Sequence, residues 1–406
     1  MNRETGKYLD PYRSNKVARG LKGKRNYEVI THNPNSVNPG ETLYVKIPKL
    51  ERGQVIAPNS MKLTFKLTTT SKVSNAANAT AAGFVANIGR NIVERITTKL
   101  GGKTMSEVDK AYIYNTFKDL WLTEKQRKNR VQQGIDKDQR KDSAAVKKAF
   151  EDRYCIPIES EIFDTHVPFY PSAIMEAIEY NIKFNDAKYV VTGTASNKTY
   201  SVTDIQLEYE TVTAPELADI IDSLYSEMRF LYEDIHLLKT EAIGKNKRVN
   251  INVDVNRTST KGILLFFQKT FTEYDSEKTS YQNPDVTNVT ITSEGISHCI
   301  YKSGMKPYNQ FDEIKKHYMT EIVKESENCM MDVESYYGDE HFALWIDLRS
   351  TEDNNLHGSG TTMSNIKHGL QLELTRSTET EYDMLVYIVA DGLIGLDNKK
   401  VSGIVH

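Results

Sequence analysis

The chain has 406 residues, of which 39% are hydrophobic and 26% charged, a composition typical of a globular protein long enough for two or three domains. Its formal net charge of −3 argues against a surface that binds polyanions non-specifically as a whole. No stretch approaches the roughly 20 consecutive apolar residues of a membrane helix, and Cys155, Cys299 and Cys329 lack the spacing of a disulfide framework or a zinc site.

The first 25 residues are polar and rich in basic side chains. Eight basic residues stand against two acidic ones, a balance of +6. This pattern predicts a flexible basic arm in residues 1–25, without the apolar core of a secretory signal. Such an arm can neutralise nucleic-acid phosphates, although a solvated arm or one that clamps a neighbouring subunit fits the same pattern. The residues proposed for this contact are Arg13, Lys16, Arg19, Lys22, Lys24 and Arg25.

Alternation of apolar and polar residues predicts the strands of a first β domain after this arm. Residues 27–33, 43–50 and 61–69 alternate in this way, and in the last of these every second residue from Met61 to Leu67 is apolar. One face of such a strand is buried and the other is solvated. These segments therefore predict strands of a β-sandwich.

Residues 105–153 interrupt the strand pattern. They are dense in Lys, Arg, Gln and Ala and contain few β-branched residues, which predicts a charged helical insertion. We expect it to be exposed, either on an outer surface or at a seam between molecules, so that a protease cuts there first. Strand patterns resume at residues 156–163 and continue through 180–185 and 200–212.

A linker helix is predicted at residues 213–228, where Thr213 is a candidate N-cap and apolar residues recur at helical spacing. Strand patterns return in residues 229–406. Two runs there, 263–267 and 384–389, are apolar without alternation. Such runs are typical of strands that are covered on both faces, inside a sandwich or beneath a neighbouring subunit.

Taken together, the short strands and polar turns predict an all-β chain of two antiparallel β-sandwiches with helical insertions. The first domain is expected to span residues 26–212, including the insertion, and the second residues 229–406. A weak internal repeat supports two similar halves, because residues 92–120 align without a gap with residues 286–314. The identical pairs are Thr98 with Thr292, Gly101 with Gly295, Tyr114 with Tyr308, Asn115 with Asn309, and Phe117 with Phe311.

Motifs for catalysis or cofactor binding are absent from the sequence. Neither GxxxxGK[ST] nor GxGxxG occurs, and there is no HExxH, CxxC or GxSxG. His357 and His368 are predicted to lie solvated in a polar loop. The same holds for two acidic pairs, Asp339 with Glu340 and Glu352 with Asp353. No catalytic residue, metal ligand or cofactor is therefore assigned.

Tyrosine is abundant, with 23 residues against only two tryptophans. Tyrosine favours protein–protein interfaces because its ring is rigid and amphipathic. It also has a high β-propensity, so ordinary strand composition explains the abundance equally well.

Several segments resemble the double jelly-roll major capsid proteins of Polinton/Maverick elements, adintoviruses and polinton-like viruses, which are relatives of the adenovirus hexon lineage. Residues 257–305 are similar to the second barrel of this family, with LLFF, an acidic-aromatic spacer, YQNP, a strand and SEG in the family's order. Residues 43–70 and 87–105 resemble the first barrel. The similarity covers most of residues 27–394.

This resemblance implies an architecture and a role. Each chain would contain two tandem eight-stranded antiparallel jelly-roll barrels, and three chains would form a pseudo-hexagonal homotrimer that tiles an icosahedral shell around a double-stranded DNA genome. The expected location is the virion, after synthesis in the host cytoplasm and assembly in the nucleus or cytoplasm. Expected partners are further copies of the chain, penton and minor capsid proteins, and DNA at the basic arm. The resemblance implies no active site, cofactor or small-molecule substrate.

Two other classes of function fit parts of the sequence. A tandem β-sandwich binding module, such as a virion spike or a lectin-like protein, would also lack enzymatic motifs. An enzyme on a jelly-roll scaffold, such as a cupin, needs clustered metal ligands on adjacent strands. The histidines are too dispersed to suggest such a cluster: His32, His166, His236, His298 and His341.

Overall fold

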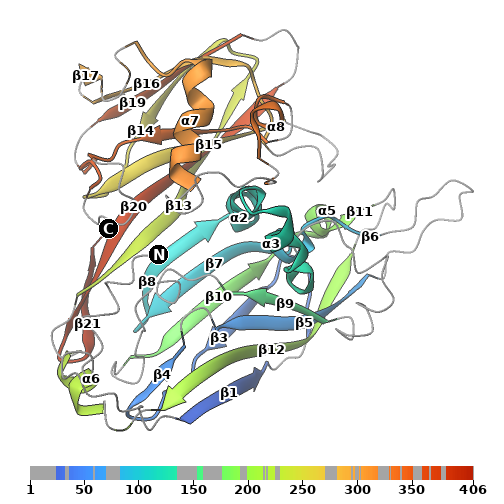
Figure 1. Ribbon diagram of the computed structural model, residues 1–406, viewed down its shortest axis with the longest axis vertical. Helices are drawn as coiled ribbons and strands as arrows, with labels where there is room; N and C mark the ends of the chain where they lie inside the picture. The colour runs from blue at the N-terminus through green and yellow to red at the C-terminus, as the bar shows by residue number, and fades with distance from the viewer. Residues whose placement is uncertain are drawn as a thin grey trace, which may run out of the picture.

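The computed structural model of the chain contains two β-sandwiches that follow one another along the long axis of the molecule (Figure 1). It describes residues 24–32, 36–57, 60–69, 83–134, 153–158, 176–192, 199–213, 215, 218–224, 229–269, 281–293, 296–297, 301, 303–318, 329, 331–338, 341–350, 359–364, 367–375 and 381–405.

The first sandwich consists of two antiparallel sheets. One has the order β1 (Lys24–Thr31), β12 (Tyr200–Thr213), β5 (Lys62–Thr69) and β9 (Arg153–Pro157), and the short strands β2 (Ser36–Val37) and β4 (Gln54–Ile56) also pair with β12. The other has the order β3 (Thr42–Lys46), β10 (Ile178–Phe184), β7 (Val93–Leu100) and β8 (Lys103–Asp109). A separate small pair joins β6 (Gly83–Phe84) to β11 (Val191–Thr192).

The second sandwich repeats this plan. Its first sheet has the order β13 (Arg229–Gly244), β20 (Tyr382–Asp397), β15 (Thr260–Lys269) and β18 (Ala343–Asp347), and β21 (Lys400–Val405) pairs with β20. Its second sheet has the order β14 (Arg248–Val253), β19 (His368–Leu374), β16 (Val286–Ser293) and β17 (Ile296–Ser297).

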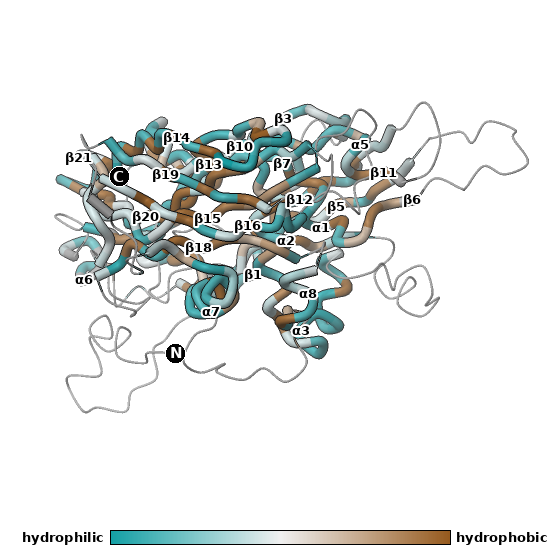
Figure 2. Tube along the Cα trace, turned by 90° about the horizontal axis from the view of Figure 1, so that it is seen from above, coloured by the Kyte–Doolittle hydropathy of each residue, from teal (hydrophilic) through white to brown (hydrophobic). Residues whose placement is uncertain are grey.

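Short helices connect these strands. They are α1 (Ile88–Asn91), α2 (Ala111–Leu120), α3 (Glu124–Lys128), the 3₁₀ helix η2 (Val131–Gln133), α5 (Ala187–Val190), α6 (Ala218–Leu224), α7 (Pro307–Tyr318) and α8 (Val333–Tyr337). Seen along the long axis, α3, α7 and α8 gather on one side of the sheets (Figure 2).

Both sandwiches have the jelly-roll order. If the eight principal strands of each are numbered along the chain, one sheet contains the first, eighth, third and sixth strands, and the other contains the second, seventh, fourth and fifth. The predicted fold class, two tandem eight-stranded antiparallel jelly rolls with helical insertions, is therefore confirmed.

The internal repeat corresponds to equivalent elements. Strands β7 and β16 are the fourth principal strand of their respective sandwiches, and helices α2 and α7 each follow the fifth. Gly101 lies in the turn after β7 with φ +58°, a conformation that favours glycine because it has no Cβ. Its counterpart Gly295 lies outside the described residues.

Two hydrophobic cores fill the sandwiches. In β5, the inward side chains Leu63 and Phe65 are buried, as their alternation predicted. The continuously apolar strands β15 and β20 are buried along nearly their whole length. Their burial arises within a single chain, since β20 lies between β13 and β15 while helix α2 packs against one face of this sheet. The prediction that these strands are covered on both faces is confirmed.

The sequence predicted an exposed helical insertion at residues 105–153. The part of this segment that the structure describes differs from the prediction. Residues 105–109 belong to strand β8, and α2 is mostly buried. Only the short α3 fits the exposed, charged helix that the composition predicted. Residues 135–152 lie outside the described residues. The sequence misled because the many charged residues that follow α2 dominated the composition of residues 105–153 and hid the apolar residues of the helix.

Helix α6 lies between the two sandwiches in the sequence, in the segment for which a linker helix was predicted. The N-cap interpretation of Thr213 is wrong, because this residue is the last of strand β12 and pairs with Lys24. Asp222 of α6 forms ion pairs with Arg52 at 2.8 Å and with Lys399 at 3.2 Å. The helix thereby connects a loop of the first sandwich to the β20–β21 turn of the second.

Candidate assembly interface

The two sandwiches are in contact with each other within the chain. Helix α2, which belongs to the first sandwich, packs against the second. The rings of Tyr114 and Tyr387 lie 6.1 Å apart, and those of Phe117 and Phe266 lie 5.1 Å apart in an edge-to-face arrangement. The Tyr387 hydroxyl donates to the carbonyl of Lys110 at 3.1 Å. Aromatic side chains thus join the helix of one sandwich to the sheet of the other.

A buried ion pair holds α2 on the first sandwich. Arg90 of α1 donates from Nε to Oδ2 of Asp119 at 2.7 Å and from Nη2 to Oδ1 at 3.1 Å. Both side chains are buried, and Arg130 lies 3.6 Å from the same carboxylate. A bidentate pair of this kind fixes orientation, because two parallel hydrogen bonds allow only one arrangement.

The second half of the chain likewise contributes side chains to the core of the first sandwich. Ile394 and Leu396 of β20 and Val401 of β21 are buried in the core of the first sandwich. The hydroxyl of Tyr232 donates to the carbonyl of Met105 at 3.1 Å, and Lys103 Nζ donates to the carbonyl of Val401 at 2.8 Å. Each core therefore contains residues from both halves of the chain, and the two sandwiches form one packed unit.

Charged residues also form ion pairs within the second sandwich. Lys261 Nζ lies 3.0 Å from Glu233 and 3.2 Å from Asp391, and Arg257 lies 2.9 Å from Asp234. Burial alone would lower the pKa of Lys261, but the two carboxylates outweigh burial and raise it. The cluster is a set of satisfied ion pairs.

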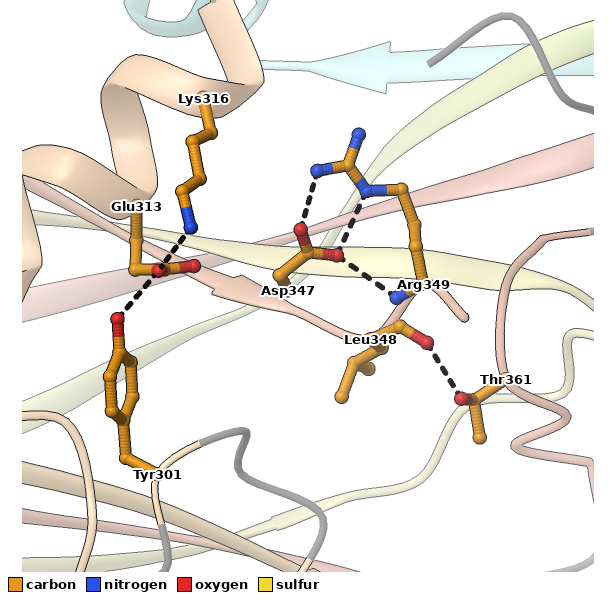
Figure 3. Close-up of polar contacts among 7 residues, drawn as sticks. All are labelled: Tyr301, Glu313, Lys316, Asp347, Leu348, Arg349 and Thr361. Atoms are coloured by element: carbon orange, nitrogen blue, oxygen red, sulfur yellow. Dashed lines mark hydrogen bonds and ion pairs between the residues drawn. The ribbon is translucent and has the colours of Figure 1, made fainter. Parts of the chain in front are cut away.

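A second polar cluster lies between α7 and β18 (Figure 3). The hydroxyl of Tyr301 donates to Glu313 at 2.7 Å, and Lys316 lies 3.2 Å from the same carboxylate. Burial, together with the hydrogen bond to Glu313, raises the pKa of Tyr301 to about 12. Arg349 Nε donates to Asp347 at 2.8 Å. The adjoining cavity of about 10 Å³ has room for about one water molecule, far less than the several hundred Å³ of a ligand pocket.

Metal ligands do not gather in the described part of the chain, where no group of three or more His, Cys, Asp or Glu side chains could hold an ion. The solvated-loop prediction is wrong for His368, which begins strand β19 and is buried beside Ser293. His357 and both acidic pairs of the sequence analysis lie outside the described residues. Within those residues, no helix is long and apolar enough to cross a membrane.

The proposed basic arm is described only at its end. Lys24 and Arg25 are the first residues of strand β1, so they belong to the sheet and not to a flexible arm. Arg25 Nε donates to Glu210 of the neighbouring strand β12 at 2.8 Å, and this pairing offsets its charge. The remaining residues of the proposed contact lie outside the described residues: Arg13, Lys16, Arg19 and Lys22.

Exposed apolar side chains mark other parts of the surface. Tyr308 on α7 is 76% exposed, whereas its repeat counterpart Tyr114 on α2 is 7% exposed. The sequence alignment paired these tyrosines, but exposure could not be predicted, because it depends on what each helix packs against. The remaining large apolar side chains of the described surface are Tyr27, Val29, Tyr44, Leu231, Val333 and Val405.

The repeated sheet order defines the chain as a double jelly roll, and it is similar in fold to solved structures of several viral capsid proteins. PBCV-1 VP54, in a crystal structure fitted into a cryo-EM reconstruction of the virophage Sputnik, matches with a TM-score of 0.62 and 10% identity over 96% of this chain and 99% of VP54. The Faustovirus major capsid protein matches with a TM-score of 0.58 and 7% identity over 94% of this chain and 92% of its own.

A third structure, the mavirus major capsid protein, has a TM-score of 0.53 and 9% identity over 91% of this chain and 88% of its own. At such low identities the likeness concerns the fold, and it extends over both sandwiches. No family model and no curated protein matches the sequence.

Proposed function

We propose that this protein is a major capsid protein, a shell component without enzymatic activity. The observation that carries the proposal is the fold match to VP54 of PBCV-1 and the capsid proteins of Faustovirus and mavirus over more than 90% of this chain. The sequence patterns described above support a narrower affiliation with the Polinton/Maverick, adintovirus and polinton-like virus group.

The assembled unit in this proposal is a homotrimer. Three chains with two similar sandwiches each provide six similar blocks, which approximate a hexagon and tile an icosahedral lattice around double-stranded DNA. A head-to-tail contact between copies that closes after three rotations yields such a ring. The junction within the chain supports this proposal, because it already joins two sandwiches through non-equivalent surfaces.

Location and partners follow from this role. The protein would reside in the virion shell after synthesis in the host cytoplasm and assembly in the nucleus or cytoplasm. Other copies of the chain would be its main partners, with penton and minor capsid proteins at special positions of the lattice. The division into an arm, a first jelly roll, a linker helix and a second jelly roll belongs to the same proposal.

Contact with the genome is proposed for the basic arm. Because Arg25 is paired with Glu210 in the sheet, the contact would depend mainly on Arg13, Lys16, Arg19 and Lys22. Deleting residues 2–23 leaves strand β1 intact and removes these four residues together with Arg3, Lys7, Glu4 and Asp10, a net charge of +4. The expected result is less packaged nucleic acid and a weaker salt dependence of assembly. Unchanged packaging and salt dependence would rule out genome contact by the arm.

The capsid proposal is tested with the purified full-length protein. Light scattering coupled to size-exclusion chromatography should give three times the 46.2 kDa of one chain, and negative-stain images at high concentration should show hexagonal plates or shells. A protein that stays monomeric, forms no shell and is retained on glycan resin would instead be a lectin-like binding module.

A further inference from the structure

The two helices of the internal repeat differ in what covers them. Tyr114 of α2 is buried against Tyr387 of β20, on one face of the second sandwich. Tyr308 of α7 occupies the aligned position in the repeat, yet it is 76% exposed. The exposed face of α7 continues through Asp312 to Lys316, at helical spacing. The helix at the equivalent position thus presents a tyrosine that no sheet among the described residues covers.

The β13–β20–β15–β18 sheet and its equivalent, the β1–β12–β5–β9 sheet, differ in what covers their outward faces. In the second sandwich, Tyr387 lies opposite Leu264, which lies opposite Trp345, the central residue of β18. All three are buried. This row belongs to the face against which α2 packs. The Tyr387 hydroxyl donates to the carbonyl of Lys110, just before the helix, and the Tyr387 ring lies against the ring of Tyr114.

The equivalent row of the first sandwich can be found from strand pairing. Gln206 of β12 lies opposite Thr64 of β5, which lies opposite Cys155, the central residue of β9. Neighbouring residues Leu207, Phe65 and Tyr154 point into the core, so this row lies on the outward face. Gln206 is the counterpart of Tyr387.

This outward face lacks a covering helix among the described residues of its own chain. At its edge, strand β1 exposes Tyr27 and Val29, which are 54% and 49% exposed. Polar residues surround them: Glu208 accepts a hydrogen bond from Tyr27, and Glu210 pairs with Arg25. An apolar strip with a charged border is typical of a contact between soluble molecules.

We propose that α7 of one copy packs, with Tyr308 as its anchor, on the outward face of β1, β12 and β5 in a second copy, near Gln206. This contact repeats between copies the contact that α2 and β20 make within one chain. It rests on the proposed capsid function and specifies which surfaces the copies use. The contact is head-to-tail, because α7 and the β1–β12–β5 face belong to different sandwiches.

A truncation of the anchor tests the proposal. In full-length protein, Tyr308→Ala should raise the concentration for half-dissociation of the trimer by about tenfold or more, as for a tyrosine that contributes strongly to an interface. Tyr44→Ala is the matched control. Tyr44 is 68% exposed on strand β3 of the other sheet, and its removal should leave the trimer unchanged.

Disulfide trapping tests the partner surface. Tyr308→Cys and Gln206→Cys are combined in a Cys155→Ser background, since Cys155 is a free cysteine on the same face. Mild oxidation should link one copy to the next and give covalent dimers and trimers on a non-reducing gel. Each single substitution in the same background should remain a monomer on that gel.

The outcomes distinguish failure of the proposed contact from failure of the capsid proposal. A trimeric wild type, a dissociating Tyr308→Ala variant and ladders only from the double-cysteine variant support the contact. A trimeric wild type with a fully stable Tyr308→Ala trimer and no ladder overturns the contact and leaves the capsid proposal standing. A wild type that is monomeric at every concentration and forms no shell overturns both.

Discussion

At the scale of single residues, Arg90 and Asp119 form a buried ion pair in the first sandwich. A carboxylate and a guanidinium that are both removed from water are tolerated only because their hydrogen bonds are satisfied. Removal of one partner leaves the other charge buried and poorly compensated.

Arg90→Met should therefore lower the free energy of unfolding by about 3 kcal/mol or more. Urea unfolding followed by circular dichroism measures the change. Arg95→Met is the control, because Arg95 is partly exposed and lies 3.6–3.7 Å from Asp109 and Glu107. Its loss should cost less than about 1 kcal/mol. Equal effects of the two substitutions would contradict the role assigned to the buried pair.

His317 shows the opposite strategy, in which a titratable ring is kept neutral. Its ring stacks on Trp345 with centroids 3.8 Å apart. Burial lowers the pKa of His317 to about 4; Glu233 opposes this shift and Arg349 adds to it. The unfolded chain binds a proton below its ordinary pKa of about 6.5, whereas the folded chain binds one only near 4. Stability from this group is therefore full above pH 6.5 and is lost as the pH falls toward 4.

The corresponding prediction compares wild type with His317→Phe, which keeps a ring but removes the titration. Between pH 7 and pH 5 the wild type should lose about 2 kcal/mol more unfolding free energy than the variant. Denaturant titrations at both pH values provide the measurement. Parallel losses in the two proteins would show that His317 titrates normally in the folded state.

Single-residue environments were also the least predictable from sequence. His368 was placed in a solvated loop because Gly, Ser and Asn precede it, yet it starts a strand and is buried. Lys24 and Arg25 have the composition of the arm but lie in strand β1. In these cases the partner strand, which is distant in sequence, decides the position, and local composition contains no information about it.

At the scale of elements, α2 and α7 occupy equivalent positions in the two sandwiches but pack differently. Both follow the fifth principal strand, but α2 packs on the sheet of the other sandwich, whereas α7 packs on β18 of its own sandwich and leaves Tyr308 exposed. Alternation and continuous apolar runs predicted β5, β15 and β20 correctly, because these patterns report burial directly. The insertion prediction failed because it averaged composition over α2 and ignored its apolar stripe.

A matched pair of substitutions tests this difference between the helices. Tyr114→Ala should lower the free energy of unfolding by about 3 kcal/mol, since it leaves a cavity at the junction of the sandwiches. Tyr308→Ala should change the stability of the single chain by less than about 0.5 kcal/mol, since the side chain is exposed there. Thermal or urea unfolding at low protein concentration gives both values. Similar losses would mean that Tyr308 is buried within the chain.

At the scale of the whole molecule, the sandwiches share their cores. Apolar residues of β20 and β21 lie in the first core, and those of α2 lie in the second. The two-domain plan could be predicted from the internal repeat and the strand patterns. The contribution of each half to the core of the other could not be predicted, because it depends on contacts between residues far apart in the chain, such as Lys103 with Val401.

Shared cores should make the two sandwiches open together. Native-state hydrogen exchange is expected to give similar opening free energies for the slowest amides of β5 and β15, within about 1 kcal/mol. Tyr114→Ala serves as the perturbation, and it should lower both values. Slow exchange in β15 with much faster exchange in β5, or an effect of the substitution on one sandwich only, would show that they unfold independently.

The position of β21 has a consequence for biosynthesis. Val401, which helps to fill the first core, is translated almost 190 residues after β12, the last principal strand of that sandwich. A nascent chain therefore leaves the first core unfilled until the second sandwich has emerged from the ribosome. Prematurely terminated products would expose apolar surface to chaperones and proteases, so that incomplete chains are removed before they accumulate.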